Sequence, residues 1–406
     1  MPHLLVDISA HGFGHVSQTA PVVNELARRI PKLRITLRTA APAALLRQRF
    51  TCDFQHLPVA FDFGMQMTNA VDVRAEQSAA AYLAFHADWN DKVEHEAQAM
   101  RTLKPDLLLA NVPYLSLAAA QEAGVRAVAM CSLNWADIYR HYCMHDAASA
   151  AVHAQMLEAY NSAEIFLKVQ PSMAMDDLRN ARSIRPIAQV GRNRRTQINA
   201  CLLPPPCRGR VGEGVETPLS HCPAPILIAP SLCSPPLQEG RDWHGSNGQS
   251  GFKTDPPEKL ILLAMGGIEY RLPVERWPHI PGVRWLVPQA WGIERSDMTS
   301  FESLGLPFSD VLASCDAVLT KPGYGTFADA VCAGVPVLYV SRRDWPEEIY
   351  LVQWLQKNGV CREVERERLQ SGDFENVLRD LWLLAKPAAP FASGAGEAAG
   401  ILEGML

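Results

Sequence analysis

Short apolar runs alternate with stretches of helical periodicity in the first half of the chain. The run HLLVDIS at residues 3–9 is largely apolar and ends in small residues, which is typical of a buried strand. In the stretch that follows it, apolar residues recur every three or four positions, as they do in an amphipathic helix. Similar apolar runs lie at residues 34–40, 106–112 and 126–132. Strands that are apolar on both faces and alternate with helices indicate a parallel sheet covered by helices.

The same alternation starts again near residue 258. Helical stretches there separate predicted strands at residues 259–267, 283–289, 316–323 and 335–341. A chain of 406 residues is long enough for two domains that each bury a core. The pattern therefore predicts an α/β fold of two Rossmann-like domains that face each other across a cleft, one over residues 1–195 and one over residues 258–406.

The segment between the two predicted domains has no sustained period of either kind. Residues 201–257 hold 11 of the 30 prolines and 7 of the 26 glycines, a composition typical of a chain that cannot bury a core. We expect residues 196–257 to be a linker that contains a disordered insertion. The insertion also carries four cysteines and two histidines, so a zinc site is the alternative, but no C-x-x-C pair or standard zinc spacing occurs. We expect no metal and no cofactor.

The charge and composition of the chain indicate which binding partners and which cellular compartment to expect. A net charge of -5 provides no basic surface for nucleic acid. No apolar run reaches about 18 residues, so no transmembrane segment is predicted. The start of the chain lacks the basic region of a signal peptide, and ten cysteines without a paired framework suit a reducing compartment. We expect a cytoplasmic protein, with peripheral membrane association left open.

The sequence PGYGT at residues 322–326 links a predicted strand to a predicted helix. Gly323 and Gly325 allow backbone amides to approach a ligand closely, and Thr326 adds a hydroxyl at the helix start. The free N–H groups and the dipole of a helix N-terminus attract an anion, most naturally a phosphate. Asp329 lies one turn further on, where a carboxylate can accept hydrogen bonds from a ribose diol. The alternative is that the glycines only form a tight turn.

Two other segments are expected at the same edge of the second sheet, because each follows a predicted strand. They contribute Gly266, Gly267, Asp344, Glu347 and Glu348. Ligands of open α/β sheets bind at the carboxyl ends of the strands. A phosphate site, a ribose site and carboxylates for a polyhydroxyl group together predict that a nucleotide sugar binds here. The alternative is that the carboxylates bind no ligand and only form part of a solvated surface.

The turn AHGFGH at residues 10–15 carries two histidines directly after the first predicted strand. Gly12 and Gly14 make a sharp strand-to-helix turn that is expected to face the cleft. Glycosyl transfer needs a base that takes the proton of the acceptor, and histidine titrates near neutral pH. His15 is the preferred candidate and His11 the second. The alternative is that each histidine only hydrogen-bonds the backbone of the turn.

A third polar segment follows the predicted strand at residues 126–132. Asn134, Trp135 and Asp137 are expected near the cleft, on the side of the acceptor. Trp135 is expected to stack on a sugar face, and Asp137 to hold a hydroxyl or to serve as the base. The alternative is a core tryptophan beside a helix-capping aspartate.

These motifs resemble those of the GT-B glycosyltransferases, the superfamily of MurG and the UDP-glycosyltransferases. The matching residues are Gly323, Thr326, Asp329, the Gly-Val-Pro run at 334–336 and Asp344. A closer resemblance is to the glycosyltransferase-like N-terminal region of L-arabinokinases and its free-standing bacterial relatives. It rests on the Gly-Tyr-Gly-Thr sequence that contains Tyr324 and on residues 342–348, 10–15 and 132–142.

The resemblance implies a transferase that moves a hexosyl or N-acetylhexosaminyl group from a nucleotide sugar, with UDP as the expected nucleotide. We expect it to be metal-independent, because PGYGT at a helix N-terminus can hold the diphosphate and no Asp-x-Asp metal motif occurs in the sequence. The resemblance also places Tyr324 among the donor-binding residues, and the acceptor is a small molecule, a glycan or a lipid. One departure is that Asp329 replaces the ribose-binding glutamate of the family with a shorter side chain. The alternatives are a nucleotide-sugar 2-epimerase of the same fold and a non-catalytic nucleotide-sugar-binding module.

Overall fold

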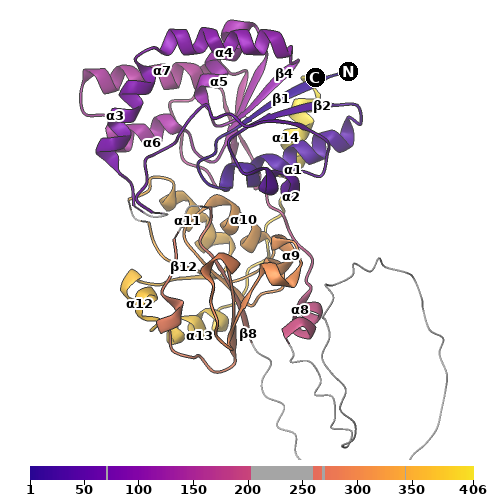
Figure 1. Cartoon of the computed structure of the whole chain (residues 1–406), viewed down its shortest axis with the longest axis vertical. Coiled ribbons are helices and arrows are strands. Elements are labelled where there is room, and N and C mark those ends of the chain that lie inside the picture. The colour runs from indigo at the N-terminus through magenta and orange to yellow at the C-terminus, as the bar shows by residue number, and fades with distance from the viewer. Residues whose placement is uncertain (70–71, 203–258, 268–269, 343) are drawn as a thin grey trace, which may run out of the picture.

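The computed structural model describes residues 1–69, 72–202, 259–267, 270–342 and 344–406. Figure 1 shows these residues as two α/β halves, with the first half of the chain above the second. The predicted insertion lies outside the described residues from residue 203 onward, and so do the cysteines and histidines of the zinc alternative other than Cys201. Residues 201–202 themselves belong to a helix, α8, which spans Arg195–Leu202.

The first sheet contains, within the described residues, seven parallel strands in the order β3-β2-β1-β4-β5-β6-β7. After β1 the chain adds β2 and β3 on one side of it, and then crosses over to add β4 to β7 on the other side. The direction of the connections therefore reverses between β1 and β4. In open α/β sheets the carboxyl ends of such a strand pair form the ligand crevice. The strands are β1 His3–Ile8, β2 Arg34–Arg38, β3 Gln55–Leu57, β4 Leu107–Asn111, β5 Ala127–Cys131, β6 Ile165–Val169 and β7 Ala181–Ile184.

Helices cover both faces of the first sheet because its strands are apolar on both sides. In β1, Leu4 and Val6 face one hydrophobic cluster, while Leu5 faces the other. Helices α1 and α2 lie on the first face, and α3 to α7 lie on the second. Their bounds are α1 Gly14–Arg29, α2 Ala43–Arg49, α3 Ala75–His86, α4 Trp89–Leu103, α5 Tyr114–Ala123, α6 Trp135–Cys143 and α7 Ala147–Ser162.

The second sheet repeats this plan with six parallel strands among the described residues, in the order β10-β9-β8-β11-β12-β13. The crossover direction reverses between β8 and β11, so the ligand crevice of this sheet is expected at their carboxyl ends. The strands are β8 Lys259–Ala264, β9 Val283–Val287, β10 Met298–Ser300, β11 Ala317–Thr320, β12 Val337–Tyr339 and β13 Cys361–Glu363.

The helices of the second half also lie on both faces of its sheet, with α9 to α11 on one side and α12 and α13 on the other. Among the described helices, none is both long enough and apolar enough to cross a bilayer. The bounds are α9 Phe308–Ala313, α10 Tyr324–Cys332, α11 Glu348–Asn358, α12 Arg366–Ser371, α13 Glu375–Leu383 and α14 Gly394–Glu403, with short 3₁₀ helices at Val274–Arg276, Gln289–Trp291 and Glu302–Leu304.

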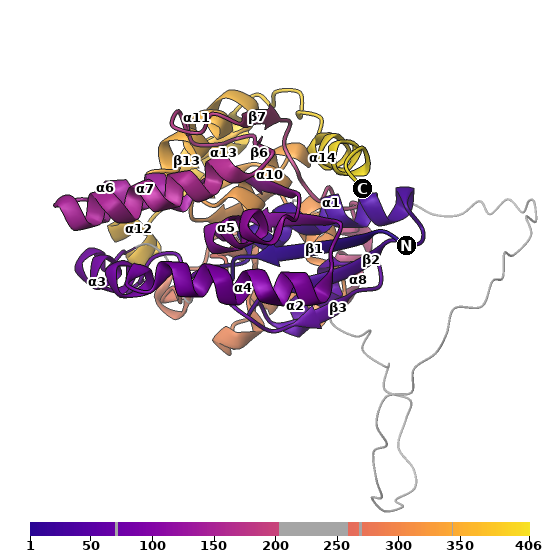
Figure 2. The same cartoon turned by 90° about the horizontal axis from the view of Figure 1, so that it is seen from above.

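The last helix of the chain, α14, packs against α1 of the first sheet, as Figure 2 shows near the C-terminus. Arg29 of α1 donates a hydrogen bond to the Gly396 carbonyl at 3.1 Å and lies 3.4 Å from the Glu403 carboxylate. Ala398, Ala399 and Leu402 of α14 join the hydrophobic cluster under α1. The end of the segment predicted as the second domain therefore lies on the first sheet.

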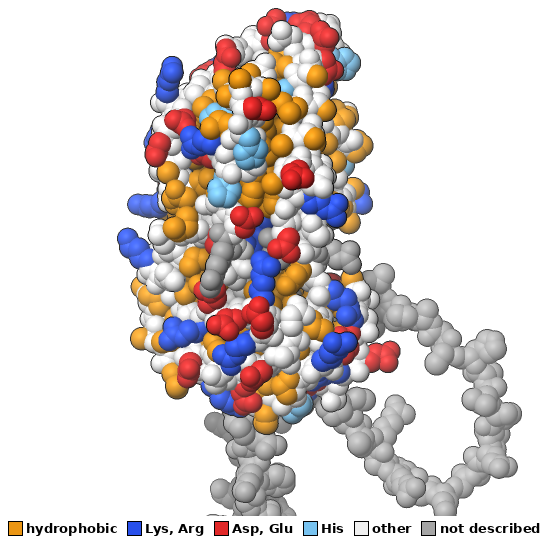
Figure 3. All heavy atoms as spheres, turned by 90° about the vertical axis from the view of Figure 1, so that its left-hand side faces the viewer, with side chains coloured by type: hydrophobic (Ala, Val, Ile, Leu, Met, Phe, Trp, Pro, Cys, Tyr) orange, Lys and Arg blue, Asp and Glu red, His pale blue; other side chains and the backbone are white. Residues whose placement is uncertain are grey.

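Charged side chains of both signs are interspersed on the face drawn in Figure 3, over the second half of the chain in particular. Asp72 of the first half and Arg366 of α12 form an ion pair of 3.2 Å. Both side chains are partly exposed, and such pairs contribute about 1 kcal/mol or less. The joint between the halves therefore depends on buried contacts more than on this surface pair.

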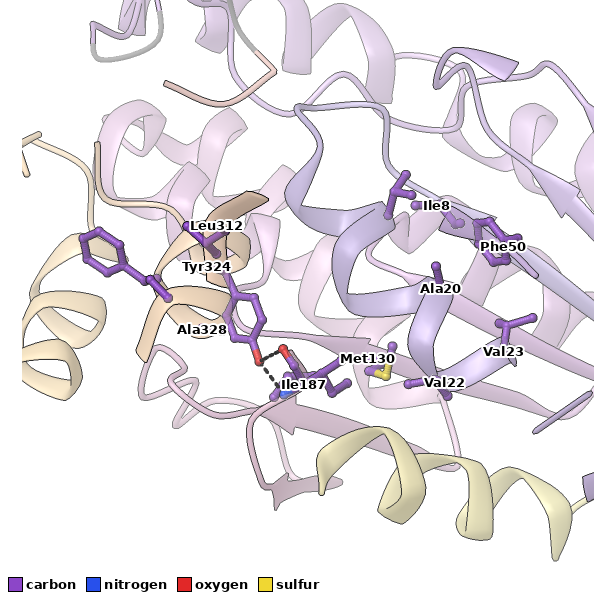
Figure 4. Packing of buried hydrophobic residues seen from close by; sticks show 14 of the residues in the cluster. Ile8, Ala20, Val22, Val23, Phe50, Met130, Ile187, Leu312, Tyr324 and Ala328 are labelled. Carbon is purple, nitrogen blue, oxygen red and sulfur yellow. Dashed lines mark hydrogen bonds between the residues drawn. The ribbon is translucent and has the colours of Figure 1, made fainter. Parts of the chain in front are cut away.

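A buried tyrosine joins the two halves (Figure 4). The hydroxyl of Tyr324, at the start of α10, accepts a hydrogen bond from the Ile187 N–H at 2.9 Å. Its own proton is shared between two acceptors, the Gln170 carbonyl at 3.0 Å and the Ile187 carbonyl at 3.2 Å. Gln170 follows β6 and Ile187 follows β7, so this hydroxyl holds the N-terminus of α10 against the first sheet.

Replacing Tyr324 with Phe is expected to lower the free energy of unfolding by about 1–3 kcal/mol, because the buried Ile187 N–H would lose its hydrogen-bond acceptor. Urea unfolding followed by fluorescence measures the change. Tyr139→Phe is the matched control, since the Tyr139 hydroxyl is buried without a hydrogen-bond partner among the described residues. That variant should be as stable as the native protein or more so. Equal stability of both variants would contradict a joining role for Tyr324.

Candidate functional site

A cleft of about 470 Å³ lies between the carboxyl ends of the two sheets. It contains most of the residues that the sequence motifs singled out. The predicted residues that line it are His11, Gly12, Gly14, His15, Gly266, Gly267, Gly323, Tyr324, Gly325, Thr326, Asp329 and Glu347. Five predicted residues do not line it: Asn134, Trp135, Asp137, Asp344 and Glu348.

The turn between β1 and α1 places His15 in the first turn of the helix. Gly12 adopts a φ of +82°, a conformation that glycine tolerates far better than other residues, and its N–H bonds the Ala10 carbonyl at 2.9 Å. Helix α1 then begins at Gly14. The ring of Phe13 reaches across to the other half, where a Cβ on Gly267 would come within 2.6 Å of it. Gly267 therefore permits the two halves to approach at this point.

The hydrogen bond made by His15 determines which of its ring nitrogens is free. Nδ1 lies 2.9 Å from Asn111 Oδ1, while the Asn111 amide nitrogen points to Gln18 Oε1 at 3.3 Å. Because an amide oxygen only accepts hydrogen bonds, Nδ1 carries the proton and Nε2 keeps its lone pair. Burial lowers the pKa of His15 to about 4. At neutral pH the imidazole is therefore uncharged and can accept a proton at Nε2.

His11 is held by aromatic rings. Its ring lies edge-on to Trp135, with centroids 5.2 Å apart, and parallel to Trp345 at 6.3 Å. Burial, together with the neighbouring His15 and Arg342, lowers the pKa of His11 to about 3. His11 is therefore also neutral at physiological pH, and it forms part of an aromatic wall of the cleft.

Asn134 and Asp137 form the start of helix α6 and do not reach the cleft. Asn134 is the N-cap residue: its side-chain oxygen accepts the Asp137 N–H at 2.8 Å, and its amide donates to the Asp137 carboxylate at 3.0 Å. Arg140 also donates to that carboxylate. Trp135 is fully buried and donates its indole N–H to Asp62 at 2.8 Å, and it supports the cleft from behind through the rings of His11 and His15.

The N-terminus of α10 forms the wall opposite α1. Gly323 precedes the helix in an extended conformation, and the backbone N–H groups of the first helical residues have no partner within the helix. A Cβ on Gly325 would lie 3.3 Å from the Ser17 side chain, so the absence of a side chain brings α10 close to the first turn of α1. Tyr324 also lines the cleft, and its hydroxyl points away into the joint between the halves.

Asp329 lies deeper in the same helix, and one of its oxygens is already engaged. Oδ1 accepts the Gln189 N–H at 2.7 Å, and Arg49 hydrogen-bonds the Gln189 side chain. Burial raises the pKa of Asp329 to about 6. Its second oxygen has no hydrogen-bond partner among the described residues, and Asp329 lines the cleft.

The three carboxylates after β12 differ in their surroundings. Glu347 lines the cleft and accepts hydrogen bonds from Ser132 at 2.7 Å and from the Trp345 indole at 3.2 Å. Glu348 begins α11 and accepts from Ser341 at 2.6 Å, outside the cleft. The Asp344 side chain is 68% exposed and lies 3.9 Å from His141 Nε2, while its backbone carbonyl accepts a hydrogen bond from the Tyr142 hydroxyl. Of the three, Glu347 alone is placed to contact a ligand in the cleft.

A chain of hydrogen bonds connects the candidate base with Glu347 across the cleft. Asn111 donates to Gln18, Gln18 donates to Ser132 at 2.8 Å, and Ser132 donates to Glu347. Asn111 and Ser132 were not predicted from the sequence, although both lie at the carboxyl ends of predicted strands. Lys321, which precedes the glycine-rich turn, and Arg342 of the Arg-Arg-Asp run were not predicted as site residues either. Both cations line the cleft.

Comparisons with known proteins agree with the architecture. No family model matches the chain. The L-arabinokinase of Arabidopsis thaliana is 24% identical over 409 residues, which cover 98% of this chain and 34% of that protein. The chain thus spans about a third of the length of the curated relative that it matches.

Solved glycosyltransferases align over the whole chain. The calicheamicin glycosyltransferase CalG4 covers 100% of this chain and 98% of its own, with a TM-score of 0.59 and 15% identity. The glycosyltransferase of kitacinnamycin covers 100% and 99%, with a TM-score of 0.54 and 15% identity. The spinosyn rhamnosyltransferase SpnG complexed with thymidine diphosphate covers 100% and 96%, with a TM-score of 0.52 and 12% identity. The resemblance predicted from the motifs is confirmed, and the chain has the GT-B fold of these glycosyltransferases.

Proposed function

We propose that this chain is a glycosyltransferase that moves a hexosyl or N-acetylhexosaminyl group from a nucleotide sugar to an acceptor hydroxyl. The observation that carries the proposal is that one cleft contains both a neutral histidine with a free acceptor nitrogen and a helix N-terminus with free N–H groups. They come from opposite sheets, as a donor site and an acceptor site would. The GT-B fold and the solved SpnG complex with thymidine diphosphate support a nucleotide-sugar donor.

His15 acts as the base in the proposed reaction. Its Nε2 takes the proton of the acceptor hydroxyl while the acceptor oxygen bonds to the anomeric carbon. The bond from that carbon to the diphosphate breaks, and the nucleoside diphosphate leaves with the bonding electrons. Asn111 keeps Nε2 free by occupying Nδ1, and His11 shapes the adjoining aromatic wall.

The donor is proposed to bind along α10. The diphosphate lies at Gly323, Gly325 and Thr326, where the helix N–H groups stabilise its charge without a metal ion. The free oxygen of Asp329 is proposed to accept from the ribose, and Glu347 from the transferred sugar. UDP is the proposed nucleotide because the motifs resemble those of UDP-glycosyltransferases, and dTDP is the next to test because SpnG was solved with thymidine diphosphate.

Product analysis separates the proposal from its two alternatives. A thermal-shift screen of UDP, dTDP, GDP and their sugars first identifies the donor. Incubation with that donor and candidate acceptors then gives a new glycoside for a transferase, an epimerised donor for a 2-epimerase, and unchanged donor for a binding module. Activity should persist in EDTA, and its loss there would contradict the metal-free scheme.

Two substitutions should separate an effect on turnover from an effect on donor binding. His15→Ala is expected to lower turnover by roughly 10²–10⁴-fold with little change in donor affinity, since only the proton acceptor is lost. Thr326→Ala should weaken donor binding by about tenfold, since one hydrogen bond is lost at the helix N-terminus. Nucleoside diphosphate release and calorimetry measure the two effects. His279→Ala and Thr102→Ala, both at exposed positions, are the matched controls. Full turnover of His15→Ala would shift the role of base to His11.

Asn111→Asp is expected to introduce a pH dependence that the native enzyme lacks. With a pKa of about 4, native His15 is already deprotonated above pH 5, so its titration does not reduce the rate between pH 5 and 8. A carboxylate at position 111 would stabilise the imidazolium and raise the pKa of His15 by about 1–3 units, so the variant should lose activity as the pH falls from 7 to 5. Asn111→Ala should lower the rate equally at every pH. Identical profiles for the native and Asn111→Asp proteins would contradict the contact with His15.

A further inference from the structure

We propose that Gln18 and Ser132 are positioning residues, which keep the Nε2 atom of His15 unprotonated. They act by connecting the Asn111 side chain with the carboxylate of Glu347, which belongs to the other half of the protein. The contact between the two halves would thereby determine which nitrogen of the candidate base carries the proton. This inference rests on the proposed function for its effect on turnover, whereas the position of the proton can be measured directly.

The connected side chains form one buried, hydrogen-bonded chain. Its contacts are 2.9 Å between His15 and Asn111, 3.3 Å between Asn111 and Gln18, 2.8 Å between Gln18 and Ser132, and 2.7 Å between Ser132 and Glu347. None of the five residues is more than 6% exposed. Because buried polar groups must find their partners within the protein, the orientation of each side chain constrains the next.

Glu347 is the end of this chain that lies in the second half. An ionised carboxylate only accepts hydrogen bonds, and Glu347 accepts one from the Ser132 hydroxyl and one from the Trp345 indole at 3.2 Å. Burial raises the pKa of Glu347, but these two hydrogen bonds and the two basic side chains of the same wall favour the ionised form. Ser132 therefore directs its proton toward Glu347 and keeps its lone pairs for Gln18.

The direction of this hydrogen bond fixes the direction of the others. Because Ser132 donates its proton to Glu347, it accepts the amide N–H of Gln18. This orientation of the Gln18 side chain points its oxygen at the Asn111 amide nitrogen. The Asn111 oxygen is then left for the Nδ1–H of His15, so Nε2 keeps its lone pair.

The same side chains can be bonded in the opposite direction when no carboxylate orients them. Ser132 would then donate to the oxygen of a rotated Gln18 amide, and Gln18 would donate to the oxygen of a rotated Asn111 amide. The Asn111 amide nitrogen would face Nδ1 of His15, and the imidazole would carry its proton on Nε2. One contact opposes this reversal independently of Glu347, a long one of 3.4 Å between the Asn111 amide nitrogen and the His15 carbonyl.

The chain makes the proton acceptor dependent on the contact between the two halves. Ser132 follows β5 of the first sheet, and Glu347 precedes α11 of the second half. If the halves moved apart, Ser132 would lose its acceptor, and both directions of the chain would become available. The imidazole of His15 would therefore be held in its proton-accepting form only while the cleft is assembled.

Nitrogen NMR of the full-length protein with labelled histidines tests this chain, because the chemical shifts of the two ring nitrogens show which one is protonated. The signals of His15 are those that the His15→Gln variant lacks. Native His15 is uncharged at neutral pH and is expected to show a protonated Nδ1 and an unprotonated Nε2.

Three variants interrupt the chain at different points. Ser132→Ala and Gln18→Met remove a connecting side chain, and Glu347→Gln removes the charge that orients the hydroxyl. Each is expected to shift the ratio of the two forms of His15 roughly 5- to 10-fold toward protonated Nε2, the effect of about one hydrogen bond. The signals of the other histidines report whether each variant keeps the native fold.

Two further variants control for the loss of a polar side chain. Ser116→Ala removes a buried hydroxyl that has no hydrogen-bond partner among the described residues and does not line the cleft. Gln121→Met removes an exposed amide outside the cleft. Both should show the native His15 signals.

The outcomes distinguish the chain from the proposed function. Native His15 signals in all three folded variants would overturn the chain and assign the orientation of the imidazole to Asn111 alone. A shift toward protonated Nε2 in a protein without transferase activity would support the chain and contradict the proposed function. If both hold, Ser132→Ala should lower turnover roughly 5- to 10-fold at unchanged donor affinity, in step with its NMR shift. Unchanged turnover despite that shift would support the chain and contradict the role of His15 as base.

Discussion

The buried hydroxyl of Tyr324 ties the start of α10 to the first sheet, and the geometry of the cleft depends on that tie. The hydroxyl forms hydrogen bonds with backbone groups of Gln170 and Ile187, which follow the last two strands of that sheet. A buried hydroxyl that lost these partners would cost free energy, so the hydrogen bonds define where α10 begins relative to α1. The same N-terminus carries the glycines and Thr326 that face the cleft.

Burial gives the two walls of the cleft opposite electrostatic character. On the first sheet it lowers the pKa of His11 and His15, so both imidazoles remain neutral and His15 keeps an acceptor nitrogen. On the second sheet Lys321, Arg342 and Glu347 line the cleft, so this wall contains two basic side chains and a carboxylate. A neutral proton acceptor therefore lies opposite a wall of charged groups.

The interior of the fold was predictable from apolar pattern, and its edges were not. The central strands β1, β4, β8 and β11 are apolar runs because helices cover them on both faces. The edge strands β3, β7, β10 and β13 are short and largely polar, so they show no apolar run and were missed. The interior strand β6 was missed as well, although it is largely apolar. The return of α14 to the first sheet was missed as well, because a helical pattern does not specify which sheet the helix covers.

The sequence by itself determined the two-sheet α/β fold and the two glycine-rich turns at which the cleft forms, since strand periodicity and strand-to-helix turns are local properties. Only the tertiary structure decided which polar side chains face the cleft. Asn134 and Asp137 satisfy each other at a helix cap, whereas Asn111 reaches His15 from a neighbouring strand. Such partnerships join residues far apart in the chain, and no local pattern encodes them.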